Sequence, residues 1–315
     1  MKPQNTKKIQ TTLLTWYETN GRHHLPWRKT HDPYAILVSE LMLQQTQVPR
    51  VIPKYNEFIM IFPKIQDLSK AKRTDVLRLW QGLGYNSRAA RLHVLANIVT
   101  DQCNGKLPTT QEKLLILPGI GPYTAGAIMI FAHNKPAHSI DVNVARVLQR
   151  LFWNKHATPK EVDELAYALI QKSNNPHDWQ SALMDFGSSI CTAKQPLCNN
   201  CPLFQCCLSR GVRLAEANAI QKKEKQGKFF GSNRWWRGQI MKTLLLEQQP
   251  VKQNCNGVQM KAETLTKIPL QSSYLKNELY KKINKSGKKR FASALQGLAD
   301  ENFIIINNER IQLKE

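Results

Sequence analysis

Four of the seven cysteines lie close together in the sequence, at spacings that suit a metal centre. Cys191, Cys198, Cys201 and Cys207 are separated by six, two and five residues, and Cys206 lies beside the last of them. Four thiolates can hold a [4Fe–4S] cluster or a zinc ion. Zinc sites with four cysteines usually contain two C-x2-C pairs, whereas this run contains one. The spacing therefore favours an iron–sulfur cluster over zinc.

Two carboxylates are candidates for acid–base chemistry. Glu40 lies within the apolar run Tyr34 to Val48, and Asp141 precedes a segment with helical periodicity. Apolar neighbours raise the pKa of a carboxyl group, so that one carboxylate can deliver a proton while a second stays charged. The structural alternatives are a wet helix face for Glu40 and a helix cap for Asp141.

A glycine-rich turn separates two predicted helices ahead of the cysteines. Leu117 to Gly121 reads LPGIG, and a small-residue helix follows it from Tyr123. Gly119 and Gly121 permit a tight turn, which brings backbone N–H groups at the second helix's N-terminus against a DNA phosphate. Pro-Gly turns are common, so the motif alone is a weak signal.

The elements that must position these residues are mostly helices. From residue 9 to about residue 209 the sequence predicts short amphipathic helices separated by Pro and Gly. Residues 211–233 are polar and rich in Lys, which predicts a linker or a solvated helix. Beyond it we expect helices over 240–248, 275–283 and 290–298 and a β-hairpin over 303–313, the order of a winged helix. The predicted class is mainly α, with a small C-terminal α+β module.

The chain is strongly basic, with 45 Lys and Arg against 23 Asp and Glu and a formal net charge of +22. Such an excess predicts a polyanionic partner: DNA, RNA or an anionic membrane surface. The excess is spread over both residues 1–210 and 211–315, which favours an extended binding face over a basic tail. No apolar stretch approaches the roughly 20 residues of a membrane span, and the first residues lack a signal-peptide core. We therefore expect a cytoplasmic protein without a membrane partner.

Several ordered motifs carry a resemblance to one family. The cysteine run and the LPGIG turn before it resemble those of the endonuclease III superfamily, whose members have a helix-hairpin-helix. The segment Ser39 to Val48, SELMLQQTQV, resembles the signature of adenine DNA glycosylases, which endonuclease III-like enzymes do not carry. Three further segments resemble adenine glycosylases: residues 16–17, 25–28 and 80–85. The resemblance covers about residues 9–210.

The resemblance implies a two-lobed helix-hairpin-helix glycosylase fold. Residues 1–29 and 138–210 would form the lobe that holds the [4Fe–4S] cluster, and residues 30–137 the lobe with the helix-hairpin-helix. The linker would span 211–233, and the winged-helix-like module 234–315 would stand where the family usually has a longer, β-rich domain. We expect this module to supply affinity for DNA of any sequence.

The implied activity is base excision repair: hydrolysis of the glycosidic bond of adenine mispaired with 8-oxoguanine or guanine in double-stranded DNA. The protein would work as a monomer, in a prokaryote at the nucleoid. Glu40 would protonate adenine and Asp141 would steady the cationic sugar. Tyr123 and Asn143 would support that carboxylate, and Asp185 would assist proton traffic.

The resemblance also implies contacts to DNA. Arg28 would contact the flipped adenine, while Gln45 and Tyr85 would fill the space left by the disrupted pair. Gly119 and Gly121 would approach a phosphate. The four cysteines Cys191, Cys198, Cys201 and Cys207 would bind the cluster, with Cys206 as a spare thiol. Val142 stands where the family usually has glycine, so the local turn is not fixed by the resemblance.

Lyases of this superfamily have a nucleophilic lysine where this chain has Tyr123, and position 145 is alanine. We therefore expect a monofunctional enzyme with little strand cleavage. Two alternatives stay open. The chain could be a thymine or uracil mismatch glycosylase on the same scaffold, against which the Glu40 motif argues. It could also be a non-catalytic iron–sulfur DNA-binding protein, which retention of both carboxylates disfavours.

Overall fold

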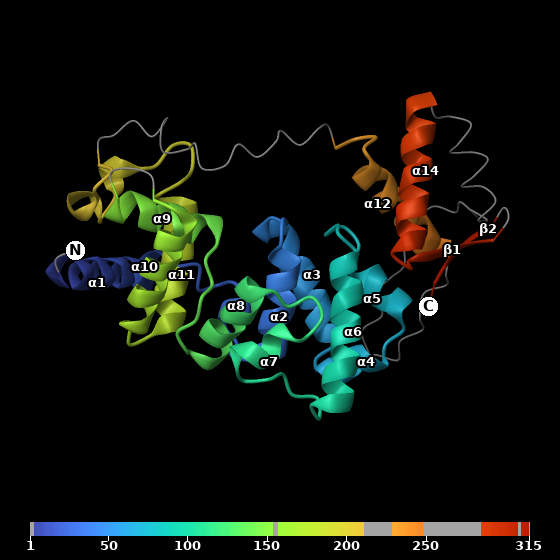
Figure 1. Cartoon of the computed structure of the whole chain (residues 1–315), viewed down its shortest axis with the longest axis horizontal. Coiled ribbons are helices and arrows are strands. Elements are labelled where there is room, and N and C mark those ends of the chain that lie inside the picture. The colour runs from blue at the N-terminus through green and yellow to red at the C-terminus, as the bar shows by residue number, and fades with distance from the viewer. Residues whose placement is uncertain (1–2, 154–156, 211–228, 248–284, 308–309, 315) are drawn as a thin grey trace. The chain divides into compact units, whose positions relative to one another are not determined.

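Helices make up most of the protein. The computed structural model describes residues 3–153, 157–210, 229–247, 285–307 and 310–314 (Figure 1). Over these ranges the only sheet has two strands, β1 (Ile304–Asn307) and β2 (Arg310–Leu313). The mainly α class is thus confirmed. None of the described helices is long and apolar enough to cross a membrane.

The described residues belong to two compact units. The first comprises residues within 1–69 and 94–222, and the second comprises residues within 70–93 and 223–315. Helix α6 (Ser87–Gln102) begins in the second unit and ends in the first. The C-terminal module is therefore not a unit by itself, because a segment from the first third of the chain completes it.

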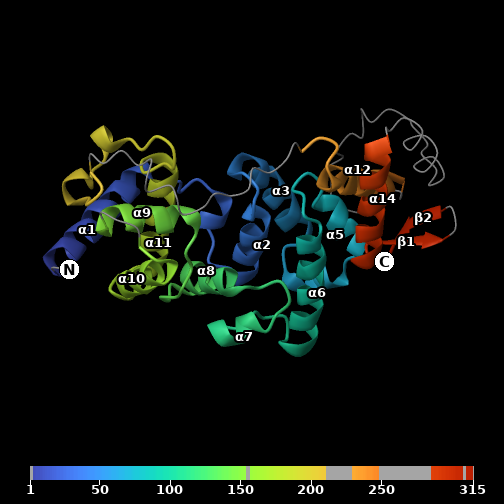
Figure 2. The ribbon, with the colours of Figure 1, turned by 45° about the horizontal axis from the view of Figure 1, so that its top comes forward.

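Helices of the first unit pack in two groups (Figures 1 and 2). One group holds α1 (Pro3–Asn20), α9 (Val142–Phe152), α10 (Pro159–Gln171) and α11 (Pro176–Ser189). The other holds α2 (Pro33–Leu43), α3 (Val48–Ile61), α7 (Gln111–Leu115) and α8 (Pro122–His133). Contacts between α8 and α11 join the groups. The remaining helices are α4 (Ile65–Lys70) and the short turns η1 (Pro26–Arg28), η2 (Cys198–Asn200) and η3 (Phe204–Cys206).

Helix α2 is buried along most of its length because its residues are apolar on every side. Its start is fixed by Asp32, whose Oδ1 accepts a hydrogen bond from the Tyr34 N–H at 3.0 Å, and by Pro33 in the first turn. All residues from Tyr34 to Met42 are buried. A carboxyl group on this helix, that of Glu40, therefore has no wet face to occupy.

Polar caps set the starts of the other helices around the site. Asp141 caps α9, Asn175 caps α11, and Thr158 caps α10 with Glu161 in a capping box. Within α8, a Cβ at Gly126 would overlap the backbone carbonyl of His138. Only glycine lets the segment that leads to Asp141 pass so close to α8.

The second unit contains α5 (Arg73–Leu79), α12 (Asn233–Glu247), α14 (Lys285–Asp300) and the hairpin. Helices α12 and α14 lie side by side in both views (Figures 1 and 2). The strands pair antiparallel, with Ile304 opposite Leu313. Two of the three predicted helices and the hairpin are found, each helix starting several residues earlier than predicted. The predicted helix over 275–283 lies outside the described residues.

Candidate active site and cysteine loop

A cavity of about 680 Å³ opens in the first unit. Its walls come from η1, α2, the turn after α2, the start of α3, α8, the start of α9 and α11. Six of the predicted site residues line it, namely Arg28, Glu40, Gln45, Tyr123, Asp141 and Asn143, and Val142 lines it as well. The fold therefore brings together side chains that lie more than 100 residues apart in sequence.

Glu40 faces this cavity from the buried helix α2 and is 6% exposed. Burial is the main cause that raises the pKa of its carboxyl group to about 7, and the negative charge of Asp141 contributes a smaller rise to that value. A hydrogen bond from the Tyr123 hydroxyl and the positive charge of Arg28 act in the opposite direction. Near neutral pH the group can thus both hold and release a proton.

Asp141 is held by the helix that it caps. Its Oδ1 accepts hydrogen bonds from the backbone N–H groups of Asn143 at 2.9 Å and Val144 at 2.7 Å, and its Oδ2 accepts one from Asn143 Nδ2 at 2.8 Å. A carboxylate is favoured at a helix N-terminus by the helix dipole. The carboxylate that caps α9 is therefore also part of the cavity wall. Capping the helix and taking part in chemistry are compatible roles for Asp141.

Val142 does not disturb this turn. It is the first residue of α9 and is exposed, and the capping residue Asp141 has an extended backbone with φ of −92°. Neither position requires the left-handed region that would favour glycine. Close packing is instead required at Gly187, where a Cβ would lie 2.8 Å from that of Asn143.

Arg28 enters the cavity from η1. Its side chain is 6% exposed, its Nη2 lies 3.5 Å from Asp185 Oδ1, and its guanidinium carbon lies 5.3 Å from the centre of the Phe131 ring. Its Nη1 is buried and has no hydrogen-bond partner among the described residues. An unsatisfied buried donor at a cavity is costly unless a ligand accepts from it.

Asp185 lies beside the cavity and is not among the residues that line it. It is 1% exposed and accepts three hydrogen bonds from Arg22: one from the backbone N–H at 2.8 Å, one from Nε at 2.8 Å and one from Nη2 at 2.6 Å. The buried carboxylate of Asp185 therefore interacts with two cations, Arg22 and Arg28. Its observed contacts orient the arginines, a role that the sequence motifs did not indicate.

Gln45 and Tyr85 share an unusual backbone conformation. Gln45, in the turn between α2 and α3, has φ of 55°, and Tyr85, before α6 in the second unit, has φ of 49°. Both side chains are exposed. Left-handed backbone is uncommon at residues other than glycine and occurs often at functional sites. In each case the conformation of the turn places the side chain on the protein surface.

The glycine-rich turn joins α7 to α8. Gly119 has φ of 87°, which makes glycine necessary there, and Gly121 is the N-cap of α8. Gly121 offers no side chain to accept from the first N–H groups of α8. These donors are thus available to an anion. Ile120 is buried and anchors the turn.

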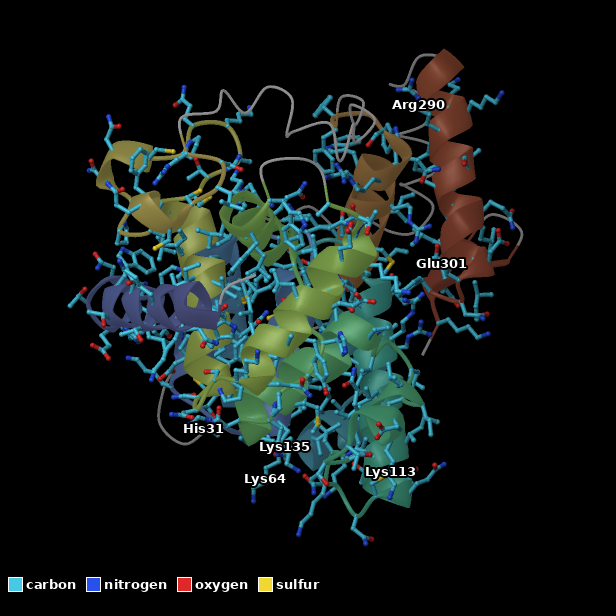
Figure 3. The ribbon with its side chains drawn as sticks, turned by 60° about the vertical axis from the view of Figure 1, so that its left-hand side comes forward. His31, Lys64, Lys113, Lys135, Arg290 and Glu301 are labelled. Carbon is cyan, nitrogen blue, oxygen red and sulfur yellow. The ribbon has the colours of Figure 1, made fainter. Side chains whose placement is uncertain are left out.

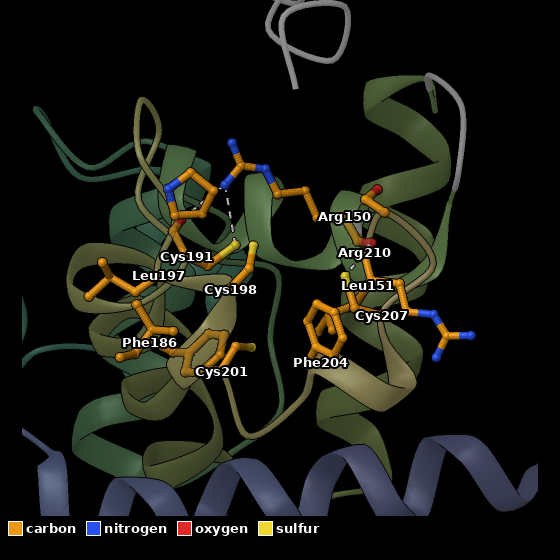
Figure 4. Close-up of a pocket in the computed structure, with 13 residues that line it drawn as sticks. Arg150, Leu151, Phe186, Cys191, Leu197, Cys198, Cys201, Phe204, Cys207 and Arg210 are labelled. Carbon is orange, nitrogen blue, oxygen red and sulfur yellow. Dashed lines mark hydrogen bonds between the residues drawn. The ribbon is translucent and has the colours of Figure 1, made fainter. Parts of the chain in front are cut away.

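The cysteine loop follows α11. Cys191, Cys198, Cys201 and Cys207 line one small cavity with Phe186, Phe204 and Arg150, whereas Cys206 is not part of its lining (Figure 4). Burial is the main cause that raises the pKa of Cys201 to about 11, with smaller contributions from the other three cysteines. The four sulfur atoms therefore face a common space, which singles out Cys207 rather than its neighbour.

Two arginines of α9 hold the start of this loop. Arg150 is buried and donates from Nη1 to Cys191 Sγ at 3.3 Å and to the Thr192 carbonyl at 2.7 Å. Arg146 donates from Nε to the Cys191 carbonyl and from Nη2 to Asn143 Oδ1, both at 2.8 Å. No sequence motif assigned a role to either arginine. Arg150 carried a signal, because it falls on the apolar face of α9, where a charge must have a partner.

Comparison with known proteins gives concordant matches. Residues 38–172 match the family model "HhH-GPD superfamily base excision DNA repair protein". The adenine DNA glycosylase of Mycolicibacterium smegmatis is 36% identical over 243 residues, which cover 76% of this chain and 81% of that protein. The adenine DNA glycosylase of Buchnera aphidicola from Schizaphis graminum is 38% identical over 217 residues, 68% of this chain and 62% of that protein.

Solved structures match the same region. A thermostable thymine-DNA glycosylase aligns with a TM-score of 0.61 and 32% identity, covering 66% of this chain and 97% of that one. An endonuclease III–DNA covalent intermediate aligns with a TM-score of 0.56 and 21% identity, and this second likeness shows the fold alone. The helix-hairpin-helix glycosylase fold is thereby confirmed. The chain spans 62%, 57% and 41% of the lengths of three curated relatives that it matches.

Proposed function

The chain belongs to the adenine DNA glycosylase family within the HhH-GPD superfamily, and we propose that it hydrolyses the glycosidic bond of adenine mispaired with 8-oxoguanine or guanine in duplex DNA. The observation that carries this proposal is that Glu40, with a pKa raised to about 7, and the capped Asp141 line one cavity. Two carboxylates in different environments suit glycoside hydrolysis. At about 680 Å³ the cavity is within the usual range for small-ligand sites.

Glu40 is the acid of the reaction. Its proton passes to N7 of adenine as the bond between N9 and C1′ breaks, so the bonding electrons leave with a neutral base. Water then adds to C1′ and gives its proton to the Glu40 carboxylate. The products are free adenine and an abasic sugar, and Glu40 ends in its starting state. Tyr123 keeps the carboxyl group in place through its hydrogen bond.

Asp141 stabilises the cationic sugar between these two steps. Its three hydrogen bonds fix the position of the carboxylate, which needs no reorganisation as positive charge develops at C1′. Asn143 supplies two of these three bonds. Gly187 allows α11 to pack against Asn143 without displacing it.

Arg28 recognises the flipped base. Its buried Nη1 requires an acceptor, and the ring nitrogens of adenine are acceptors. Asp185 and Phe131 hold the guanidinium in place through an ion pair and a cation–π contact. The base reaches this position only after leaving the stack, and Gln45 and Tyr85 occupy the space it vacates. The N-terminus of α8 binds a phosphate of the same duplex.

A [4Fe–4S] cluster is the proposed cofactor, with Cys191, Cys198, Cys201 and Cys207 as ligands. In the described part of the chain, no three His, Cys, Asp or Glu side chains are placed to hold a single metal ion. A four-iron cluster does not require that, because each thiolate binds a different iron atom. The support for a cluster rather than zinc comes from the spacing of the four cysteines, which contains a single C-x2-C pair. When bound, the cluster would cross-link the loop and hold it folded.

The enzyme acts as a monomeric, monofunctional glycosylase. No lysine lies at position 123 or 145, so an amine is not available there to attack C1′ and cleave the strand. Duplex DNA as the substrate also accounts for the net charge of +22 and, in a prokaryote, implies work at the nucleoid.

The test is incubation with three duplexes that differ only in one pair: A opposite 8-oxoguanine, A opposite G, and T opposite G. Base loss from the two adenine duplexes alone is expected. Loss of thymine alone would refute the proposal and favour a thymine-DNA glycosylase, the name of the matched structure. Binding without base loss in any duplex would favour a non-catalytic protein.

A further inference from the structure

Tyr85 lies in a turn that is held firmly from within the second unit. Arg88 donates from Nη2 to the carbonyls of Leu83 at 3.2 Å and Gly84 at 2.9 Å, and Trp80 Nε1 donates to Gly84 at 3.3 Å. The Arg88 guanidinium carbon lies 5.5 Å from the centre of the Tyr85 ring. The backbone is thus fixed, and Tyr85 is 38% exposed at this turn.

The C-terminal module also contacts Tyr85. Arg234, in the first turn of α12, donates from Nη1 to the Tyr85 hydroxyl oxygen at 3.0 Å. Its guanidinium carbon lies 5.9 Å from the centre of the Tyr85 ring and 4.9 Å from that of Phe229. Phe229 is 54% exposed. Aromatic rings beside a cation form a surface suited to nucleic acid, because bases stack on the rings and phosphates are attracted to the charge.

The position of Arg234 is itself fixed by α14. Near the start of α14, Arg290 Nη1 donates to the Gly231 carbonyl at 3.3 Å, and just past its end Glu301 pairs with Arg237 at 2.6 Å. Figure 3 shows Arg290 and Glu301 at opposite ends of this helix. Trp236 packs on Phe291 with ring centres 5.3 Å apart. The first turns of α12 are therefore held by contacts near both ends of α14 and by the packing of Trp236 on Phe291.

The same module also holds the helix that precedes the Tyr85 turn. Arg73, at the start of α5, donates from Nη1 to the Asn302 carbonyl at 2.8 Å, and its guanidinium carbon lies 5.0 Å from the centre of the Phe303 ring. Contacts between α5 and α12 complete this interface. Module and turn thus form one body, and the module reaches Tyr85 both through α5 and directly through Arg234.

We propose that Arg234 is a positioning residue for Tyr85, holding the phenol ring ready to insert into the DNA stack beside a mispair. The inference rests on the proposed glycosylase function and extends it, because it assigns the C-terminal module a part in recognition beyond general affinity. Arg234 acts through Tyr85 and need not touch the reacting base. Its loss should therefore affect distortion of a mispaired duplex more than binding to an intact one.

The test compares Arg234→Ala with Lys242→Ala, a matched loss of one exposed positive charge from the same helix. Each substitution is made in the wild-type protein, where single-turnover excision is measured. Each is also made in the Glu40→Gln protein, where the fluorescence of 2-aminopurine placed beside the mispair reports unstacking of the duplex. Arg234→Ala should lower both by roughly five- to tenfold, the size of one net hydrogen bond, whereas Lys242→Ala should weaken binding to all duplexes alike. Arg234→Lys should restore part of the loss.

Tyr85→Phe provides the second arm, because it removes the hydroxyl and keeps the ring. If Arg234 acts through Tyr85, the double variant should be no worse than the worse single variant. Additive losses, or an Arg234→Ala protein equal to Lys242→Ala in both readouts, would overturn the inference while adenine excision by wild type stands. Absence of excision by wild type would overturn the proposed function and this inference with it.

Discussion

The hydroxyl of Tyr123 donates a hydrogen bond to the buried carboxylate of Glu40 and thereby limits how far burial raises the pKa of this group. Burial alone would raise the pKa of Glu40 further, and the Tyr123 hydrogen bond opposes that rise because it stabilises the charged form. The pKa of Tyr123 is itself raised well above its usual value, so it remains a donor at physiological pH.

Replacing Glu40 by Gln should abolish adenine excision while leaving affinity for a mispaired duplex within about twofold. The amide fills the same space but has no proton to deliver, and general acid catalysis contributes roughly 10²- to 10⁴-fold. Single-turnover excision and equilibrium binding on the same duplex measure the two effects. Excision within threefold of wild type would remove Glu40 from the acid role.

The rate of excision should fall as pH rises through about 7, where Glu40 loses its proton. Tyr123→Phe removes the hydrogen bond that favours the carboxylate, so the pKa of Glu40 should rise and the fall in rate should move to higher pH. Rate against pH from 5 to 9 for both proteins measures this. A shift to lower pH in the variant would contradict the assigned hydrogen bond.

The same titration predicts a change in stability. The pKa of Glu40 is raised by folding, so its contribution to stability is present below pH 4.5, its ordinary pKa, and is lost as pH rises through about 7. Above pH 8 the buried charge costs about 3 kcal/mol at most. Glu40→Gln should therefore raise Tm at pH 8 and change it little at pH 4.5. An equal change in Tm at both pH values would indicate that the effect is not the titration.

The cysteine loop gives a prediction with an internal control. Cys207→Ser should remove the broad visible absorption of a [4Fe–4S] cluster and lower the iron content, whereas Cys206→Ser should retain both. The reason is that Cys207 lines the common cavity and Cys206 does not. The opposite pattern would reverse the register of the last ligand, and one zinc with no iron would refute the cluster.

Sequence patterns predicted the structure best at positions where the local sequence allows a single conformation or environment. Glu40 is buried because its neighbours in the sequence are apolar. The turn at Gly119 needs glycine because its backbone has a positive φ. Patterns could not decide between Cys206 and Cys207, because adjacent residues differ only in the direction of their side chains. They could not indicate that Asp185 serves two arginines, since Arg22 and Arg28 lie over 150 residues away.

The C-terminal module illustrates a different limit. Its helices and hairpin were predictable from periodicity, yet its partner was not, because residues 70–93 join it across more than 130 residues of sequence. The expectation that the module supplies only general affinity for DNA stays a prediction, and the contact between Arg234 and Tyr85 argues for more. Deleting the module would uncover α5, so point variants are the cleaner test.

The chemistry at position 123 allows a last prediction, on strand cleavage. Wild type should leave an intact strand with an abasic site that breaks only on heating in alkali, because Tyr123 cannot form a Schiff base. Borohydride added during turnover should therefore trap no covalent adduct between protein and DNA. The matched variant Tyr123→Lys places an amine on the cavity wall, in the first turn of α8 and next to Asp141 and Glu40 in the lining. It should gain trapping and some strand cleavage, while losing excision rate because Glu40 loses its hydrogen bond. Efficient trapping by wild type would show that another amine reaches C1′ and that the enzyme is not monofunctional.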